Sequence, residues 1–215
     1  MGYVALRLLF FLLIVKPFLL LAVGVNVRRR DRLPTTGPAL IVANHNSHLD
    51  TLVLMALLPW RSWHRVRPVA SADYFLRDRK RAWFTTRVIG IIPVAAGGGR
   101  PQAEVLEPVH AALRAGDIVI FFPEGTRGEP ERLGKLKTGI AWLAEQLPDV
   151  VICPVYLHGL GKVLPKGDWL PVPFFCDAWV RESLRWTGER ASFMAELAAR
   201  LTPPPTDEPA DAEDR

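Results

Sequence analysis

Short runs of consecutive apolar residues alternate with stretches of helical periodicity along most of the chain. Two of these runs, at 38–44 and 118–122, are apolar at nearly every position, unlike the alternating pattern of a half-exposed strand. Strands of this kind are buried on both faces of their sheet, and their alternation with helices is typical of parallel connections. The sequence therefore predicts an α/β fold with a mixed, largely parallel sheet that is flanked by helices.

One folded domain is expected, because 215 residues suffice for a single substantial core. It should occupy 33–202, between an N-terminal membrane anchor at 1–32 and a disordered, acidic and proline-rich tail at 203–215. Strands are expected at 38–44, 66–71, 91–94, 118–122, 150–155 and 178–180, and helices at 48–58, 79–88, 101–115, 136–147 and 191–201.

The segment 3–27 is almost entirely apolar, which predicts a membrane helix. A cleaved signal peptide is not expected, because the charges follow the apolar run and no small-residue cleavage site is present. Lys16 and Pro17 interrupt the run, and a lysine at the bilayer centre costs roughly 2.5–3.5 kcal/mol. A kinked span and a re-entrant or interfacial helix both stay open, with a buried core helix as a third possibility.

Arginines follow this apolar segment directly, which places its C-terminal end in the cytoplasm by the positive-inside rule. The folded domain is therefore expected on the cytoplasmic face of the cell inner membrane. A second basic run, at 77–81, would also attract anionic lipid.

The folded part of the chain is strongly basic. The formal charge is +5, and the tail from 203 holds five acidic residues and one arginine, a net of −4, which leaves +9 on 1–202. Such an excess favours an anionic partner. A membrane surface is expected rather than nucleic acid, because no nucleic-acid-binding motif accompanies the charge. The two cysteines, Cys153 and Cys176, predict buried reduced thiols and neither a disulfide framework nor a zinc site.

The sequence NHNSHLD lies where an expected strand ends and an expected helix begins. His45 and Asp50 can meet there if His45 lies in the turn and Asp50 points back from the first helical turn. The carboxylate would then hold the imidazole tautomer, and the histidine could take a proton from a hydroxyl group. Two alternatives stay open: a capping box with Ser47 as N-cap, and a metal site that includes His48.

A second motif, FFPEGTRG, follows the apolar run 118–122, at the carboxyl end of a strand, where α/β folds bind ligands. Glu124 and Thr126 supply an acceptor and a hydroxyl, and the guanidinium of Arg127 suits a phosphate. Gly125 permits a tight turn. The alternative is a polar β-turn with a surface arginine.

Together and in this order, the two motifs resemble those of the glycerophospholipid acyltransferase family, which includes 1-acylglycerol-3-phosphate acyltransferases. The family's first motif, His, four residues and Asp, matches His45 and Asp50. Its Glu-Gly-Thr-Arg motif matches Glu124 to Arg127, and its apolar-proline motif resembles the sequence around Pro154. The resemblance covers 38–181, about two-thirds of the chain.

This resemblance implies transfer of a fatty acyl group from acyl-CoA or acyl-carrier protein to the hydroxyl of a lysophospholipid, with 1-acyl-glycerol-3-phosphate giving phosphatidic acid. It implies a co-substrate and no cofactor or metal. His45 would be the general base and Asp50 would orient it. The acceptor would be held by Glu124, Gly125, Thr126 and Arg127.

One departure from the family pattern concerns the acceptor. Members often carry an arginine soon after a strand that here reads GIIPV, but this chain has Ala-Ala-Gly-Gly-Gly before Arg100. Either Arg100 takes that part, or the acceptor is another lysolipid such as a lyso-ornithine lipid. An inactive membrane-tethered lipid-binding module is the non-enzyme alternative. Lys135 and Lys137 are interpreted as solvated surface lysines, with contact to a phosphate of the donor or the acceptor as the alternative.

Overall fold

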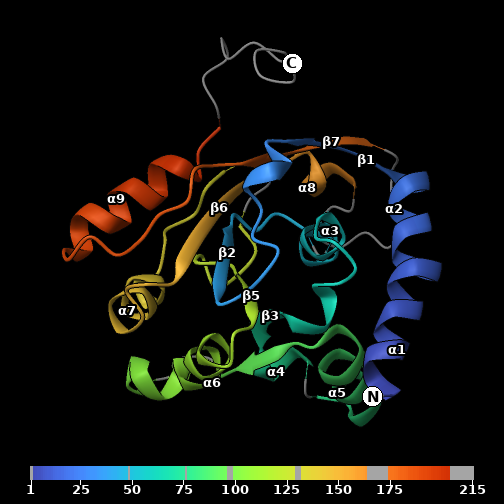
Figure 1. Cartoon of the computed structure of the whole chain (residues 1–215), viewed down its shortest axis with the longest axis horizontal. Helices are drawn as coiled ribbons and strands as arrows, with labels where there is room; N and C mark the ends of the chain where they lie inside the picture. Colours follow the sequence, from blue (N-terminus) through green and yellow to red (C-terminus); the bar gives the residue numbers. More distant parts are fainter. Residues whose placement is uncertain are drawn as a thin grey trace.

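The computed structural model describes residues 2–47, 49–75, 77–95, 99–128, 132–163 and 174–203 (Figure 1). Nearly all of the expected acidic tail, from 204, lies outside these ranges. So does His48, so that the metal alternative falls partly outside the described residues.

A seven-stranded sheet forms the centre of the described chain, in the order β1-β7-β6-β2-β5-β3-β4. Neighbouring strands are parallel except β6 and β7, which are antiparallel. The prediction of a mixed, largely parallel sheet is confirmed. The strands are β1 (Val23–Arg28), β2 (Ala39–Ala43), β3 (Val66–Ser71), β4 (Ile92–Val94), β5 (Ile118–Phe121), β6 (Val151–His158) and β7 (Phe174–Val180).

Helices cover both faces of the sheet (Figure 1). In β2, Ile41 packs with the core on one face, whereas Leu40 and Val42 pack with the core on the other, which explains why the strand is apolar at every position. The first face is covered by the N-terminal helix and α3 (Asp50–Leu57), and the second by α6 (Gln102–Arg114), α7 (Gly139–Gln146) and α9 (Arg190–Arg200).

Shorter helical elements connect these layers. The helix expected at 79–88 is α5 (Arg79–Phe84), and the chain continues as the π-helical η4 (Thr85–Ile89), which ends at Gly90 with a φ of 83°. The other short elements are η2 (Arg30–Arg32), η3 (Trp63–Arg65), α4 (Ala72–Phe75) and α8 (Leu160–Val163).

The N-terminal helix is continuous from α1 (Gly2–Phe10) through the π-helical η1 (Phe11–Val15) to α2 (Lys16–Ala22). Its part Tyr3–Leu21 is long and apolar enough to cross a membrane, by length and composition. One face packs on the domain through Arg7, Phe11, Val15 and Leu19, at four-residue spacing, and all four are buried. The opposite face exposes large apolar side chains, including Leu13, Leu20 and Leu21.

The apolar segment does not remain helical as far as expected. The sequence predicts a membrane segment through residue 27, but the helix ends at Ala22 and Val23–Arg28 forms β1, which pairs with β7. The reason is visible in the sequence, because Val23, Val25 and Val27 alternate with Gly24 and Asn26, a period of two that favours a strand.

Candidate active site

Two turns lie side by side at the carboxyl edge of the sheet. They follow β2 and β5, which are parallel neighbours with Val42 opposite Phe121. The turn after β2 contains His45, and the turn after β5 contains Glu124. The two are joined directly, since the N–H of Gly128 donates to the carbonyl oxygen of His45 at 3.1 Å.

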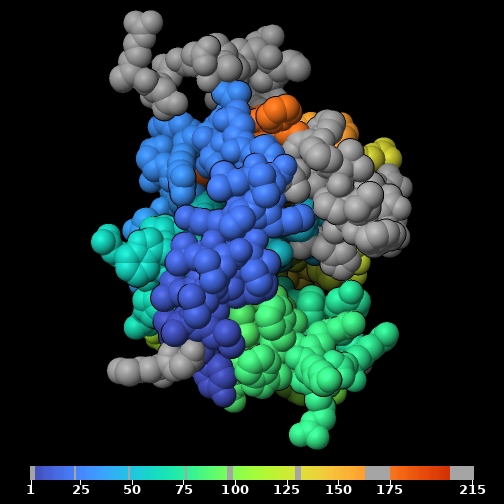
Figure 2. Space-filling view, turned by 90° about the vertical axis from the view of Figure 1, so that its right-hand side faces the viewer, coloured from blue at the N-terminus to red at the C-terminus, as the bar shows by residue number. Residues whose placement is uncertain are grey.

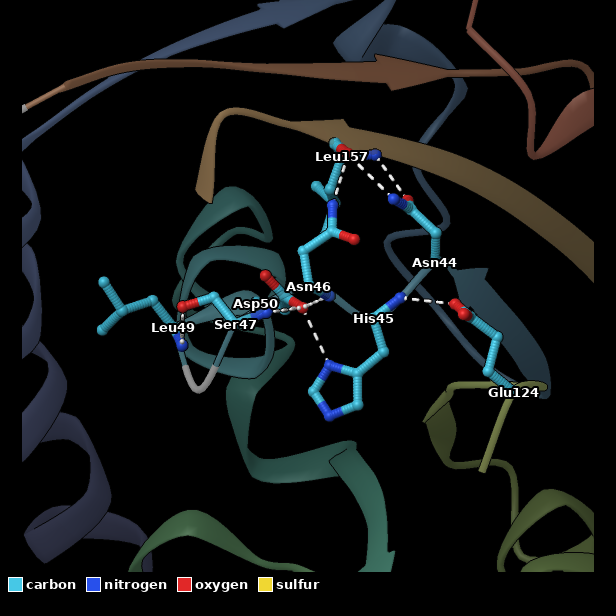
Figure 3. Close-up of polar contacts among 8 residues, drawn as sticks. All are labelled: Asn44, His45, Asn46, Ser47, Leu49, Asp50, Glu124 and Leu157. Atoms are coloured by element: carbon cyan, nitrogen blue, oxygen red, sulfur yellow. Dashed lines mark hydrogen bonds and ion pairs between the residues drawn. The ribbon is translucent and has the colours of Figure 1, made fainter. Parts of the chain in front are cut away.

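The imidazole of His45 is held by Asp50, as the sequence predicts. Nδ1 of His45 lies 2.8 Å from Oδ2 of Asp50 (Figure 3). That oxygen also accepts the N–H groups of Asn46 at 2.6 Å and Ser47 at 2.8 Å. A carboxylate with three donors around one oxygen fixes the proton on Nδ1 and leaves Nε2 as the ring's acceptor.

The capping alternative is realised in part. Asp50 reaches back to the N–H of Ser47, as the carboxylate of a capping box does, but the hydroxyl of Ser47 accepts the N–H of Leu49 at 3.3 Å instead of capping Asp50. One carboxylate therefore both closes the turn and holds the ring. Its side chain is fully buried, and Oδ1 has no hydrogen-bond partner among the described residues.

Further contacts lock this turn in place. Asn44 exchanges two hydrogen bonds with the backbone of Leu157 in β6, and Nδ2 of Asn46 donates to the same carbonyl oxygen (Figure 3). The ring of Phe122 stacks on the imidazole of His45, with centroids 4.1 Å apart and planes 19° apart. These partners are missed by motif reasoning, although Phe122 immediately precedes the second motif.

Glu124 is buried between the turns and does not line the cavity described below. Its Oε1 accepts the N–H of His45 at 2.8 Å, and its Oε2 accepts the N–H of Gly134 at 2.9 Å. The carboxylate is thus the polar link between the first motif and the loop after the second. Its contact with the acceptor stays a prediction, and both of its oxygens already accept hydrogen bonds from backbone amides.

A cavity of about 790 Å³ opens beside His45. The structure brings together there the predicted residues His45, Gly125, Thr126, Arg127 and Arg100. Lys137, whose side chain is exposed as expected of a surface lysine, also lines this cavity. Much of the remaining wall is apolar, from Leu52, Val69, Phe75, Ile89, Ile91 and Phe121.

Gly125 is required at its position in this wall. Its φ is 74°, in the left-handed region, and a Cβ there would lie 2.8 Å from Cε of Lys137. Any side chain would therefore force the end of the Lys137 side chain to move. Arg127 has no carboxylate partner within the described ranges, so its guanidinium is available to an anion.

Other candidate chemistry is not assembled in the described ranges. No group of three His, Cys, Asp or Glu side chains there could hold a metal ion. Cys153 and Cys176 are both buried, as predicted, and neither is joined in a disulfide within the described residues. Burial raises the pKa of the Cys153 thiol to about 12.

The sequence matches the acyltransferase family profile over residues 24–158. It is 30% identical to a chloroplastic 1-acyl-sn-glycerol-3-phosphate acyltransferase of Arabidopsis thaliana over 67% of this chain and 38% of the relative. It is 24% identical to a 1-acyl-sn-glycerol-3-phosphate acyltransferase of Pseudomonas aeruginosa over 81% of this chain and 65% of the relative. The chain thus spans less than two-thirds of the length of these curated relatives.

The fold is also that of a solved structure. The crystal structure of the 1-acyl-sn-glycerophosphate (LPA) acyltransferase PlsC from Thermotoga maritima matches with a TM-score of 0.69, over 90% of this chain and 78% of that one, at 19% identity. At this identity the likeness concerns the arrangement of the sheet and its helices.

Proposed function

Because the chain belongs to the acyltransferase family, we propose that it moves a fatty acyl group from acyl-CoA or acyl-carrier protein to the hydroxyl of a lysophospholipid, with 1-acyl-glycerol-3-phosphate as acceptor and phosphatidic acid as product. The observation that carries the proposal is that His45, held by the buried Asp50, lines the same cavity as Arg127.

In this mechanism Nε2 of His45 takes the proton of the acceptor hydroxyl while the oxygen attacks the thioester carbonyl. The carbon–sulfur bond then breaks, an ester forms, and the proton returns to the departing thiolate. Asp50 keeps the proton on Nδ1 and stabilises the imidazolium that forms. No acyl-enzyme is needed, because the two substrates meet in one cavity.

Cations of the cavity would hold the acceptor's phosphate. Arg127 has no competing carboxylate in the described chain, and Arg100 and Lys137 line the same wall. The position of Arg100 supports its part in place of the arginine that many family members carry earlier. The apolar wall residues would accommodate acyl chains.

Membrane attachment is part of the proposal. The N-terminal helix packs one face on the domain and exposes apolar side chains such as Leu13 and Leu20 on the other, 69% and 82% exposed. This arrangement supports a helix that lies in the plane of one leaflet of the inner membrane, with the domain on the cytoplasmic side. The acceptor and product, which partition into the bilayer, would then be close to the cavity.

The central test is the loss of the general base. We expect His45→Ala to lower kcat by about 10²–10⁴, with an unchanged far-ultraviolet circular dichroism spectrum. The measurement is acyl transfer by purified protein with acyl-CoA or acyl-carrier protein and a panel of lysolipids, including lyso-ornithine lipid.

His64→Ala is the matched control, because His64 is exposed and does not line this cavity. Wild-type turnover by His45→Ala would remove the mechanism. If the wild type acylates only lyso-ornithine lipid, that lipid is the acceptor in place of 1-acyl-glycerol-3-phosphate. A wild-type protein that binds lysolipid without turnover would indicate a binding module.

A further inference from the structure

One basic surface is not used by the proposed mechanism. The segment 73–87, which includes α5 and most of η4, carries five basic and two acidic residues, a net of +3. All five basic side chains are exposed: Arg77, Arg79, Lys80, Arg81 and Arg87. The field of this surface favours an anionic partner.

Aromatic side chains are interleaved with these cations. The guanidinium of Arg81 lies 5.4 Å from the ring centroid of Tyr74, and that of Arg87 lies 4.9 Å from that of Tyr3. Trp83 contacts Tyr3 edge to face, with centroids 6.3 Å apart. These five residues are called the aromatic–arginine patch. Its three aromatic residues are 44–48% exposed, which is a large apolar surface to leave in water.

The patch is continuous with the anchor helix. Tyr3 belongs to α1, and the ring of Phe10 packs against Phe84 of α5 with centroids 5.1 Å apart. Figure 2 shows the green surface that contains α5 directly beside the blue N-terminal helix on one face of the molecule. The N-terminal helix and the surface that contains α5 therefore share one face of the molecule.

The same patch borders the cavity. Tyr74 is exposed and also lines the cavity, together with Phe75 of the same short helix and Ile89 at the end of η4. The cavity therefore reaches the surface next to Arg81. A lipid headgroup held at the patch would be adjacent to the cavity's opening.

The chemistry of this face favours a bilayer over an acidic protein. Tyrosine and tryptophan are enriched at membrane interfaces. Each arginine near the surface raises the affinity for an anionic membrane about fivefold. An acidic protein would account for the arginines, but not for their continuity with the exposed apolar face of the helix.

We infer that the aromatic–arginine patch docks on the anionic headgroups of a phospholipid leaflet and passes the acceptor from that leaflet into the cavity. The docking stands on the patch itself, whereas the passage of the acceptor rests on the proposed function.

The test uses the double variant Arg81→Gln/Arg87→Gln in the full chain. Binding is measured by co-sedimentation with phosphatidylcholine vesicles, with and without phosphatidylglycerol. We expect the double variant to bind the anionic vesicles about 25-fold more weakly and the neutral vesicles as wild type does. Arg114→Gln is the control, since Arg114 is an exposed arginine on α6, a helix that lies away from the N-terminal helix (Figure 1).

The activity arm separates docking from chemistry. With an acceptor carried in anionic vesicles, kcat/KM should fall in parallel with binding, whereas a short-chain acceptor dissolved in water should give wild-type kcat and KM. Undiminished binding to anionic vesicles would overturn the inference, as would wild-type kcat/KM with the vesicle-borne acceptor. Equal loss on neutral vesicles, or lost binding to an acidic carrier protein without vesicles, would also overturn it. If the wild type acylates neither acceptor, the proposed function fails, while the vesicle result still decides the docking.

Discussion

Both carboxylate oxygens of Glu124 are occupied by backbone amides, those of His45 and Gly134. A glutamine would keep one acceptor and present an NH₂ group to the other amide. We therefore expect Glu124→Gln to lower the free energy of unfolding by about 1–3 kcal/mol and to lower kcat, because the His45 turn loses its link. The KM for the acceptor should stay close to that of the wild type. Urea unfolding and steady-state kinetics measure these effects.

Glu104→Gln, on an exposed position of α6, is the control for the loss of one carboxylate. A raised KM with unchanged stability would instead return Glu124 to the acceptor site.

The motifs predict which residue types meet at this edge, and the His45–Asp50 contact follows from them. They do not predict where Glu124 points, or that Phe122 and Lys137 join the site, because those contacts depend on how separate strands and loops are placed.

At the scale of elements, Arg7 joins the N-terminal helix to the segments around β3 and η4. Its guanidinium is buried and donates to the carbonyl oxygens of Trp63 in η3, Val66 at the start of β3 and Val88 in η4. Arg7→Met would keep the apolar stem and leave these carbonyls without their donor. We expect a loss of at least about 2 kcal/mol in the free energy of unfolding, measured by denaturation in detergent.

A double-mutant cycle with Gly90 tests this contact. A Cβ at Gly90 would lie 1.7 Å from Nη2 of Arg7, and its φ is 83°. Gly90→Ala should therefore be strongly destabilising in the wild type. In the Arg7→Met background it should cost only the left-handed strain, about 1–2 kcal/mol. If the losses of unfolding free energy in the two single variants simply add in the double variant, the guanidinium does not fill this space.

Element prediction succeeded where periodicity was local and failed where an apolar run concealed a change of period. The strand expected at 66–71 is β3 with the same bounds, and α6 and α9 differ from expectation by one residue at each end. By contrast, β1 was not predicted, because it lies within an apolar segment whose composition predicts a membrane helix. β7 begins earlier than expected and pairs with β1, a long-range partner that no local pattern reveals.

At the scale of the whole molecule, the N-terminal helix is a layer of the domain as well as a candidate membrane element. Phe11 packs on Trp63 with ring centroids 5.0 Å apart, and the chain passes from the helix directly into the sheet. If the N-terminal helix crossed a bilayer while packed on the domain, Trp63 and η4 would enter the hydrocarbon as well. A helix lying in one leaflet keeps these contacts and immerses only its exposed apolar face.

This geometry predicts that both ends of the helix lie on the cytoplasmic side. One cysteine placed in a hydrophilic tag before Met1, and one introduced by Asp31→Cys at an exposed position, should both react with a membrane-impermeant maleimide in inverted inner-membrane vesicles and not in intact spheroplasts. The native thiols give little background, because both are buried and burial raises the pKa of Cys153 to about 12, so the reactive thiolate is scarce near neutral pH. Labelling of the tag cysteine in spheroplasts would instead require a helix that crosses the bilayer and separates from the domain at Arg7.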